Sequence, residues 1–147
     1  MALTEAGDRH RGDYTISTDP ARLDLDVVHR FLSEEAYWSP GVARGVVERS
    51  IRNSLCFGLY HGRDQVGFAR VVTDRAAFAY LADVFVLPAH RGSGLGKWLI
   101  ETVLAHPDLQ NLRRIFLGTA DAHALYERYG FRPVDPKRMM ERRLTPE

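Results

Sequence analysis

An apolar strand-like run, a glycine-rich loop and a helix-like run follow one another in VFVLPAHRGSGLGKWLI, residues 84–100. Pro88 has no N–H to donate to a sheet, so a strand that enters this segment has to end there. Gly92, Gly94 and Gly96 then follow within five residues. A loop that only connects two elements does not need three glycines, because each adds conformational entropy that folding must remove. The segment therefore predicts a strand–loop–helix unit whose loop backbone is approached closely by another group.

The start of the helix indicates what that group can be. We expect this helix over residues 95–105, and its first N–H groups have no acceptors within the helix. These donors and the positive end of the helix dipole favour an anion, and Arg91 and Lys97 add two cations at the rim. The alternative is a tight turn with solvated charges, which explains one glycine rather than three. The loop is therefore predicted to bind a phosphate group.

Two common phosphate-binding patterns do not fit this loop. A nucleoside triphosphate loop has Ser or Thr after its Gly-Lys pair, where this chain has Trp98. A dinucleotide fingerprint that starts at Gly92 needs a glycine where Lys97 stands. The spacing that does fit is R-x-x-G-x-G, over residues 91–96.

In this motif the sequence resembles the GCN5-related N-acetyltransferases (GNAT), whose loop of this form binds the pyrophosphate of coenzyme A. A second run, LYERYGF over residues 125–131, is similar to another signature of that family. The order of elements over about residues 13–144 resembles the family as well. One position departs from the pattern, because Thr119 stands where the family often has Asn, seven residues before Tyr126.

Hydrophobic periodicity predicts an α+β chain with strands and helices in a defined order. The expected strands are residues 13–18, 55–62, 65–73, 78–88, 113–119, 131–134 and 138–144, and the expected helices are residues 20–38, 42–54, 95–105 and 121–129. With the resemblance, this order implies a single GNAT-type domain, with a mixed, mostly antiparallel sheet of about seven strands and about four helices. We expect residues 1–12 to be a flexible N-terminal segment and residues 13–147 to form the N-acetyltransferase domain.

Composition narrows the class of protein. The 147 residues include 20 Lys and Arg against 19 Asp and Glu, which argues against a general nucleic-acid or membrane binder. The single Cys56 excludes an internal disulfide and fits a reducing compartment. The six histidines show no ligand spacing. We therefore expect a cytoplasmic monomer or homodimer that binds no metal, nucleic acid or membrane.

The resemblance implies acetyl-CoA as the acyl-donor cosubstrate. A backbone N–H of Phe85 or Val86 would then face the thioester oxygen and polarise it. The implied cofactor-binding residues are Phe85, Val86, Arg91, Gly92, Ser93, Gly94, Leu95, Gly96, Lys97 and Thr119.

Two side chains are candidate catalytic groups. Tyr126 matches the tyrosine that acts as acid in many family members, and a phenol with a pKa of about 10 can protonate a leaving thiolate; the alternative is a packing role. Asp83 is a carboxylate in an apolar strand and would steer or deprotonate the amine. If the turn near residues 73–76 forms a simple hairpin, Asp83 instead lies within reach of an ion pair with Arg70. Both interpretations of each residue stay open.

The segment SEEAYW, residues 33–38, is the candidate acceptor site. In the family, the region between the first two helices commonly borders the acceptor. The carboxylates and aromatic rings of Glu34, Glu35, Tyr37 and Trp38 would suit an amine, as would Asp83. The alternative is a solvated helix face.

Our main hypothesis is an enzyme that moves an acetyl group from acetyl-CoA directly to an amine of a small-molecule acceptor, without a covalent enzyme intermediate. Two alternatives stay open: a coenzyme A-binding regulatory module without turnover, and an N-acetyltransferase of a protein or peptide amine. Tyr126 and Asp83 favour an enzyme, whereas Thr119 in place of Asn favours the regulatory module.

Overall fold

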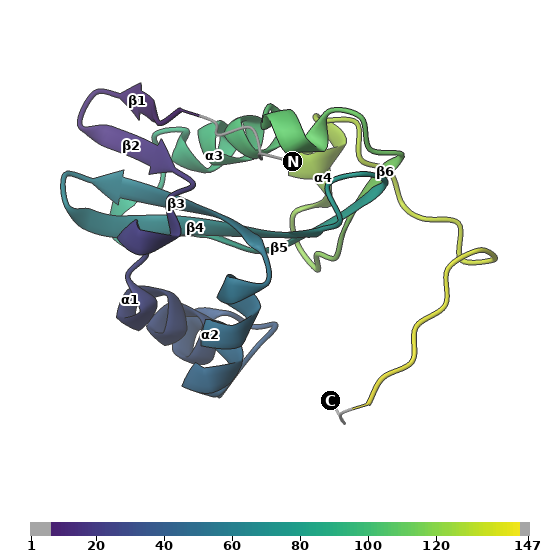
Figure 1. Ribbon diagram of the computed structural model, residues 1–147. Helices are drawn as coiled ribbons and strands as arrows, with labels where there is room; N and C mark the ends of the chain where they lie inside the picture. Colours follow the sequence, from purple (N-terminus) through teal and green to yellow (C-terminus); the bar gives the residue numbers. More distant parts are fainter. Residues whose placement is uncertain (1–6, 145–147) are drawn as a thin grey trace. The chain divides into compact units, whose positions relative to one another are not determined.

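One mixed sheet forms the centre of the computed structural model, which describes residues 7–144 (Figure 1). Its six strands are β1 (Arg9–Arg11), β2 (Tyr14–Ser17), β3 (Leu55–His61), β4 (Asp64–Thr73), β5 (Phe78–Val86) and β6 (Arg114–Leu117). Each strand pairs with the next one along the chain. The first five strands are antiparallel, and β6 runs parallel to β5.

Helices lie on both sides of this sheet. They are α1 (Leu25–Arg30), which continues into a π-helical turn (Phe31–Glu35), α2 (Arg44–Arg52) and α3 (Leu95–Leu104). A further helix, α4 (His123–Glu127), belongs to a separate unit of the chain. In Figure 1, α1 and α2 lie together on one side of the sheet and α3 lies on the other. Among the helices of residues 7–144, none is long and apolar enough to cross a membrane.

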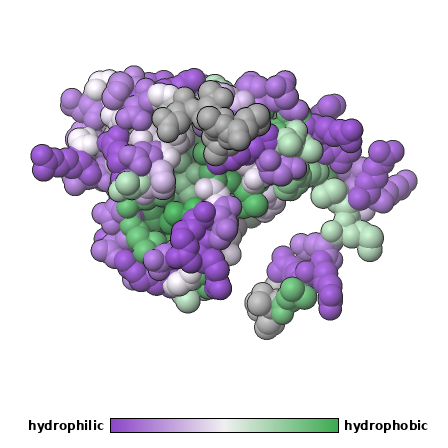
Figure 2. Space-filling view, viewed as in Figure 1, coloured by the Kyte–Doolittle hydropathy of each residue, from purple (hydrophilic) through white to green (hydrophobic). Residues whose placement is uncertain are grey.

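Successive side chains along each strand point to opposite faces of the sheet, so the strands contribute to the packing on both faces. Cys56 and Phe68 face α1 and α2, and Phe85 stacks on Phe31 of the π-helical turn with ring centroids 4.0 Å apart. Figure 2 shows hydrophobic residues in a band between these two helices and the sheet. Fully burying one such side chain stabilises the fold by about 1.5–3 kcal/mol. This packing fixes the end of β5, which leads into the glycine-rich loop.

A β-bulge interrupts the pairing of β4 with β5. Phe68 pairs with Phe85 and Arg70 with Ala82, so two steps along β4 correspond to three steps along β5. The extra residue is accommodated at Asp83, which has a φ of 54°. The pairing of β5 with β6 ends at Leu81. The last five residues of β5 therefore lie beyond the end of the β6 ladder, and three of them, Ala82, Phe85 and Val86, pair with β4.

The N-terminal expectation was wrong for residues 9–11. They form β1 instead of belonging to a flexible segment, because Gly12, with a φ of 57°, allows a two-residue hairpin turn between Arg11 and Tyr14. Residues 1–6 of the expected segment lie outside the described residues. The sequence signal was the Gly-Asp pair between the two short polar and apolar runs.

The chain divides into two compact units, residues 1–117 and residues 118–147. Within the described part of the second unit, α4 ends before Gly130, whose φ of 89° suits a helix terminus. The strands expected at residues 131–134 and 138–144 were wrong, since no strand is formed between residues 118 and 144. Pro133 and Pro136 have no N–H for a ladder, and Met140 is 97% exposed, so no apolar face holds this segment as a strand. The sheet over residues 7–144 accordingly has six strands rather than about seven.

Candidate active site

The glycine-rich loop presents an open helix terminus. Gly92 and Gly94 have φ values of 95° and 83°, a conformation that residues with a Cβ rarely adopt. Gly94 is the residue before α3, and no side chain caps this helix end. A Cβ placed on Gly92 would have no heavy atom within 4 Å among the described residues. The first N–H groups of α3 therefore face a space that an anion can enter.

The third glycine has a different role from the first two. Gly96 lies in the first turn of α3, and its φ is not positive. A Cβ on Gly96 would lie 4.0 Å from Cγ2 of Val86, an ordinary contact distance. The backbone conformation therefore requires two of the three glycines, and the third lies where α3 passes β5.

Three cations lie around the loop, and two of them, Arg91 and Lys97, were expected from the sequence. Arg91 donates its Nε–H to the carbonyl of Val86 at 2.7 Å, which ties the loop to the end of β5. Lys97 is exposed on the first turn of α3. The third cation is Arg11 of β1, whose Nη1 lies 3.9 Å from the position of a Cβ on Gly94. Its guanidinium lies over the ring of Trp98, 4.8 Å from the ring centroid, which holds the charge beside the loop.

The structure distinguishes the two expected backbone donors, Phe85 and Val86. The N–H of Leu87 donates to the carbonyl of Val66 at 2.8 Å, and in an antiparallel pair this direction alternates from residue to residue. The N–H of Phe85 therefore points toward β4, and that of Val86 points away from β4. Because the β6 ladder ends at Leu81, no described strand pairs with β5 on that side of Val86. Val86 is thus the residue whose N–H is directed to the open edge.

Asp83 is held by two partners. Its Oδ2 accepts the Nε–H of Arg70 at 2.8 Å, and its Oδ1 accepts the indole N–H of Trp38 at 2.9 Å. The side chains of Arg70 and Asp83 are only 18% and 13% exposed. The ion pair considered as the alternative to a catalytic role is therefore present. Both oxygens of the Asp83 carboxylate therefore accept hydrogen bonds from protein side chains.

The structure brings only part of the expected acceptor segment to Asp83. Trp38 reaches it across 45 positions of sequence, and the ring of Tyr37 packs edge-on against Trp38 with centroids 5.1 Å apart. Tyr37 and Trp38 are 55% and 42% exposed, so this aromatic pair is accessible. Glu34 and Glu35 are exposed in the π-helical turn and lie outside this cluster.

Tyr126 and Thr119 belong to the second unit and are described within it. The Tyr126 ring packs edge-on against Phe131, with centroids 5.7 Å apart. The hydroxyl oxygen of Thr119 accepts the backbone N–H of Ala122 at 3.0 Å, just before α4. A Thr at this position therefore shapes the turn into the helix, where the family often has Asn. The relation of Tyr126 to the loop of the first unit stays a prediction.

Cys56 is unsuited to act as a nucleophile. Its side chain is buried among apolar residues, and this burial raises the pKa of its thiol to about 12. A thiol with that pKa is protonated at neutral pH. Within residues 7–144, no group of three or more His, Cys, Asp or Glu side chains is placed to hold a metal ion.

Comparison with known proteins identifies the family. A family model described as an acetyltransferase (GNAT) domain matches residues 52–133. A candidate acetyltransferase of Gibberella zeae, FG08082, is 35% identical over 146 residues, which cover 84% of this chain and 81% of that protein. A crystal structure of a candidate GNAT-family acetyltransferase from Xanthomonas campestris pv. campestris is 50% identical, with a TM-score of 0.87 and coverage of 94% of this chain and 96% of that one. The chain belongs to the GNAT acetyltransferase family.

More distant structures share the fold. A predicted acetyltransferase from Clostridium acetobutylicum, crystallised with acetyl-CoA, is 17% identical, with a TM-score of 0.68 and coverage of 89% and 95% of the two chains. The expected α+β fold and the expected family are both confirmed. The GNAT family uses acetyl-CoA, and the open helix terminus, the two positive-φ glycines and the cations around the loop fit the pyrophosphate of that cosubstrate.

Proposed function

We propose that this chain is an N-acetyltransferase that transfers an acetyl group from acetyl-CoA directly to the amine of a small molecule. The observation that carries the proposal is the junction of β5 and α3. Within ten residues it provides an unpaired strand edge at Val86, two positive-φ glycines and an uncapped helix N-terminus. This combination suits a cosubstrate that carries both a carbonyl and a pyrophosphate.

We assign acetyl-CoA binding to the glycine-rich loop. The N–H groups at the start of α3 would hold the pyrophosphate, and Arg91, Lys97 and Arg11 would compensate its charge. When bound, acetyl-CoA supplies an acyl group activated as a thioester. The Val86 N–H would lie beside that carbonyl and stabilise the charge that develops on its oxygen.

The acceptor is assigned to the surface formed by Tyr37 and Trp38. Two accessible aromatic faces can hold a protonated or neutral amine. We assign Asp83 a positioning role, because its two carboxylate oxygens hold Arg70 and Trp38. Glu34 and Glu35 would raise the local concentration of cationic amines from their exposed positions.

Transfer in one step needs no enzyme nucleophile. The amine nitrogen forms a bond to the acyl carbon, the carbon–sulfur bond breaks, and the amine loses a proton to solvent. Tyr126 is proposed to protonate the leaving thiolate. The high pKa of the buried Cys56 supports direct attack over an acyl-cysteine intermediate.

A panel of amines tests this proposal. Diamines, arylalkylamines and amino sugars would be offered with acetyl-CoA, with thiol release as the readout and a lysine-containing peptide as the alternative acceptor. We expect turnover with at least one small amine and none with the peptide alone. Binding of acetyl-CoA by calorimetry without turnover on any acceptor would favour the regulatory module, and no binding at about millimolar acetyl-CoA would refute the proposal.

A further inference from the structure

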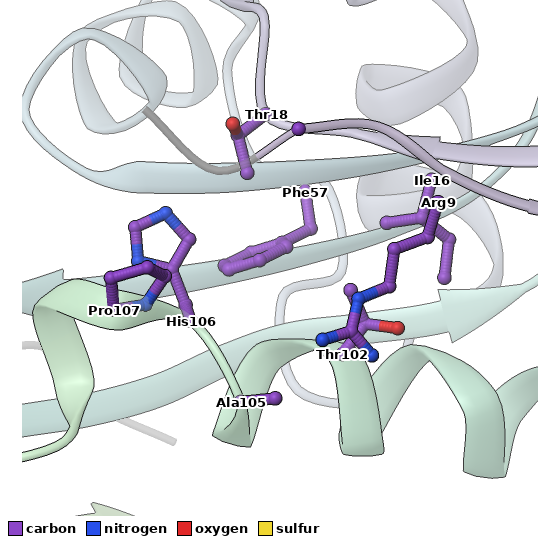
Figure 3. A pocket seen from close by; sticks show the side chains of 9 residues that line it. Arg9, Ile16, Thr18, Phe57, Thr102, Ala105, His106 and Pro107 are labelled. Atoms are coloured by element: carbon purple, nitrogen blue, oxygen red, sulfur yellow. The ribbon is translucent and has the colours of Figure 1, made fainter. Parts of the chain in front are cut away.

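A cavity of about 310 Å³ lies at the end of α3 that is remote from the glycine-rich loop (Figure 3). Thr102 and His106 line it from the C-terminal part of α3 and the residues after it, and Arg9, Ile16 and Phe57 line it from β1, β2 and β3. Thr102 lies eight positions after Gly94, which along a helix corresponds to about 12 Å. The cavity is therefore separate from the proposed acetyl-CoA site.

His106 directs a neutral hydrogen-bond donor into this cavity. The imidazole is only 4% exposed, and its Nδ1 accepts the backbone N–H of Asp108 at 3.1 Å. A nitrogen that accepts carries no hydrogen, so the ring proton is on Nε2. Burial lowers the pKa of His106, which keeps the ring neutral at pH 7. Among the described residues, no acceptor is found for this Nε2–H.

Arg9 supplies a full positive charge. Figure 3 shows the ring of Phe57 between the side chains of Arg9 and His106. No acidic side chain lines the cavity within residues 7–144, and in that range Arg9 forms no ion pair. Thr18 also lines the cavity. The polar groups of the cavity therefore match an acceptor with negative charge.

The remaining lining is apolar and restricts which anion fits. Phe57 and Ile16 are each 1% exposed, so a ligand covers hydrocarbon as well as donors. A phosphate dianion carries more charge than the single guanidinium of Arg9 compensates, and it would leave the apolar surface of Phe57 and Ile16 uncovered. A volume near the lower end of ligand pockets, which span roughly 300–1,000 Å³, restricts the ligand to a small molecule.

We propose that this cavity binds a small organic carboxylate, with the carboxylate on Arg9 and the apolar part extending along Phe57 and Ile16 toward the ring of His106. The site is independent of the proposed transfer reaction.

Benzoate is the probe, because it joins one carboxylate to one small ring. Calorimetry on the full chain at pH 7 should show binding at about millimolar Kd or tighter, with benzamide and inorganic phosphate at least about tenfold weaker. Arg9→Gln should weaken benzoate by at least about tenfold, whereas Arg63→Gln, at an exposed arginine outside the cavity, should leave it unchanged. Acetyl-CoA binding should be the same in all three proteins, which separates this test from the proposed function.

A second measurement does not depend on a variant. The Nε2 resonance of His106 should shift on addition of benzoate and stay unchanged with benzamide. No heat and no shift at about 10 mM benzoate, equal affinity in Arg9→Gln, or displacement of benzoate by acetyl-CoA would each overturn the proposal.

Discussion

Gly94 offers a direct test of why the loop is rich in glycine. At a φ of 83° its backbone is left-handed, and alanine there costs about 1–2 kcal/mol because its Cβ approaches the following carbonyl. Crowding adds little, since the nearest heavy atom to a Cβ at Gly94 is Nη1 of Arg11 at 3.9 Å. We therefore expect Gly94→Ala to lower the free energy of unfolding by about 1–2 kcal/mol and Tm by roughly 3–8 °C. The added methyl group also stands between Arg11 and the loop, so acetyl-CoA affinity should fall by about tenfold.

Gly45→Ala is the matched control. A Cβ on Gly45 also meets open space among the described residues, but Gly45 lies inside α2 with an ordinary φ. Alanine should therefore raise the free energy of unfolding by about 0.5–1 kcal/mol there. Thermal unfolding with and without acetyl-CoA measures both effects. If Gly94→Ala were as stable as the wild type while Gly45→Ala gained stability, the argument from backbone conformation would be wrong.

Three other predictions address the remaining site residues and the buried histidine. Asp83→Asn leaves the Arg70 guanidinium without its charge partner, so the free energy of unfolding should fall by about 1–3 kcal/mol with little loss of kcat; a large loss of kcat at unchanged Tm would instead assign the carboxylate to the amine. Tyr126→Phe should lower kcat by about 10²–10⁴-fold with acetyl-CoA affinity nearly unchanged, and near wild-type kcat in saturating substrates would end its role as the acid. Burial lowers the pKa of His106 below its ordinary 6.5, so the unfolded chain binds more protons just below pH 6.5 and stability falls as the pH falls through that range. In urea unfolding, His106→Gln should lose less free energy of unfolding than the wild type when the pH is lowered from 7 into the acid range. Equal dependence of this free energy on pH in the two proteins would contradict the assignment to His106.

The strand–loop–helix structure around the glycines could be predicted from the sequence because its determinants are local. A proline that ends a strand, glycines at left-handed positions and a helix start all depend on neighbours within a few residues. The spacing over residues 91–96 therefore predicted the family, which is confirmed, whereas the phosphate-binding role of the loop stays a proposal. The Arg70–Asp83 ion pair could also be anticipated, because one hairpin turn determines which residues lie opposite each other.

Tertiary structure determined the contacts between residues that lie far apart in the sequence. Arg11 joins the loop only because the β1–β2 hairpin places it over Trp98, and Trp38 meets Asp83 only because the segment after the π-helical turn reaches β5. Val86, and not Phe85, directs its backbone N–H to the open edge of β5. This follows from the direction of the hydrogen bond between Leu87 and Val66 and from the end of β6 pairing at Leu81. Strands were expected at residues 131–134 and 138–144 but are not formed, whereas the polar residues 9–11 do form a strand. A strand is stabilised by the edge it pairs with and by the face it buries, and both are supplied by residues far away in the chain.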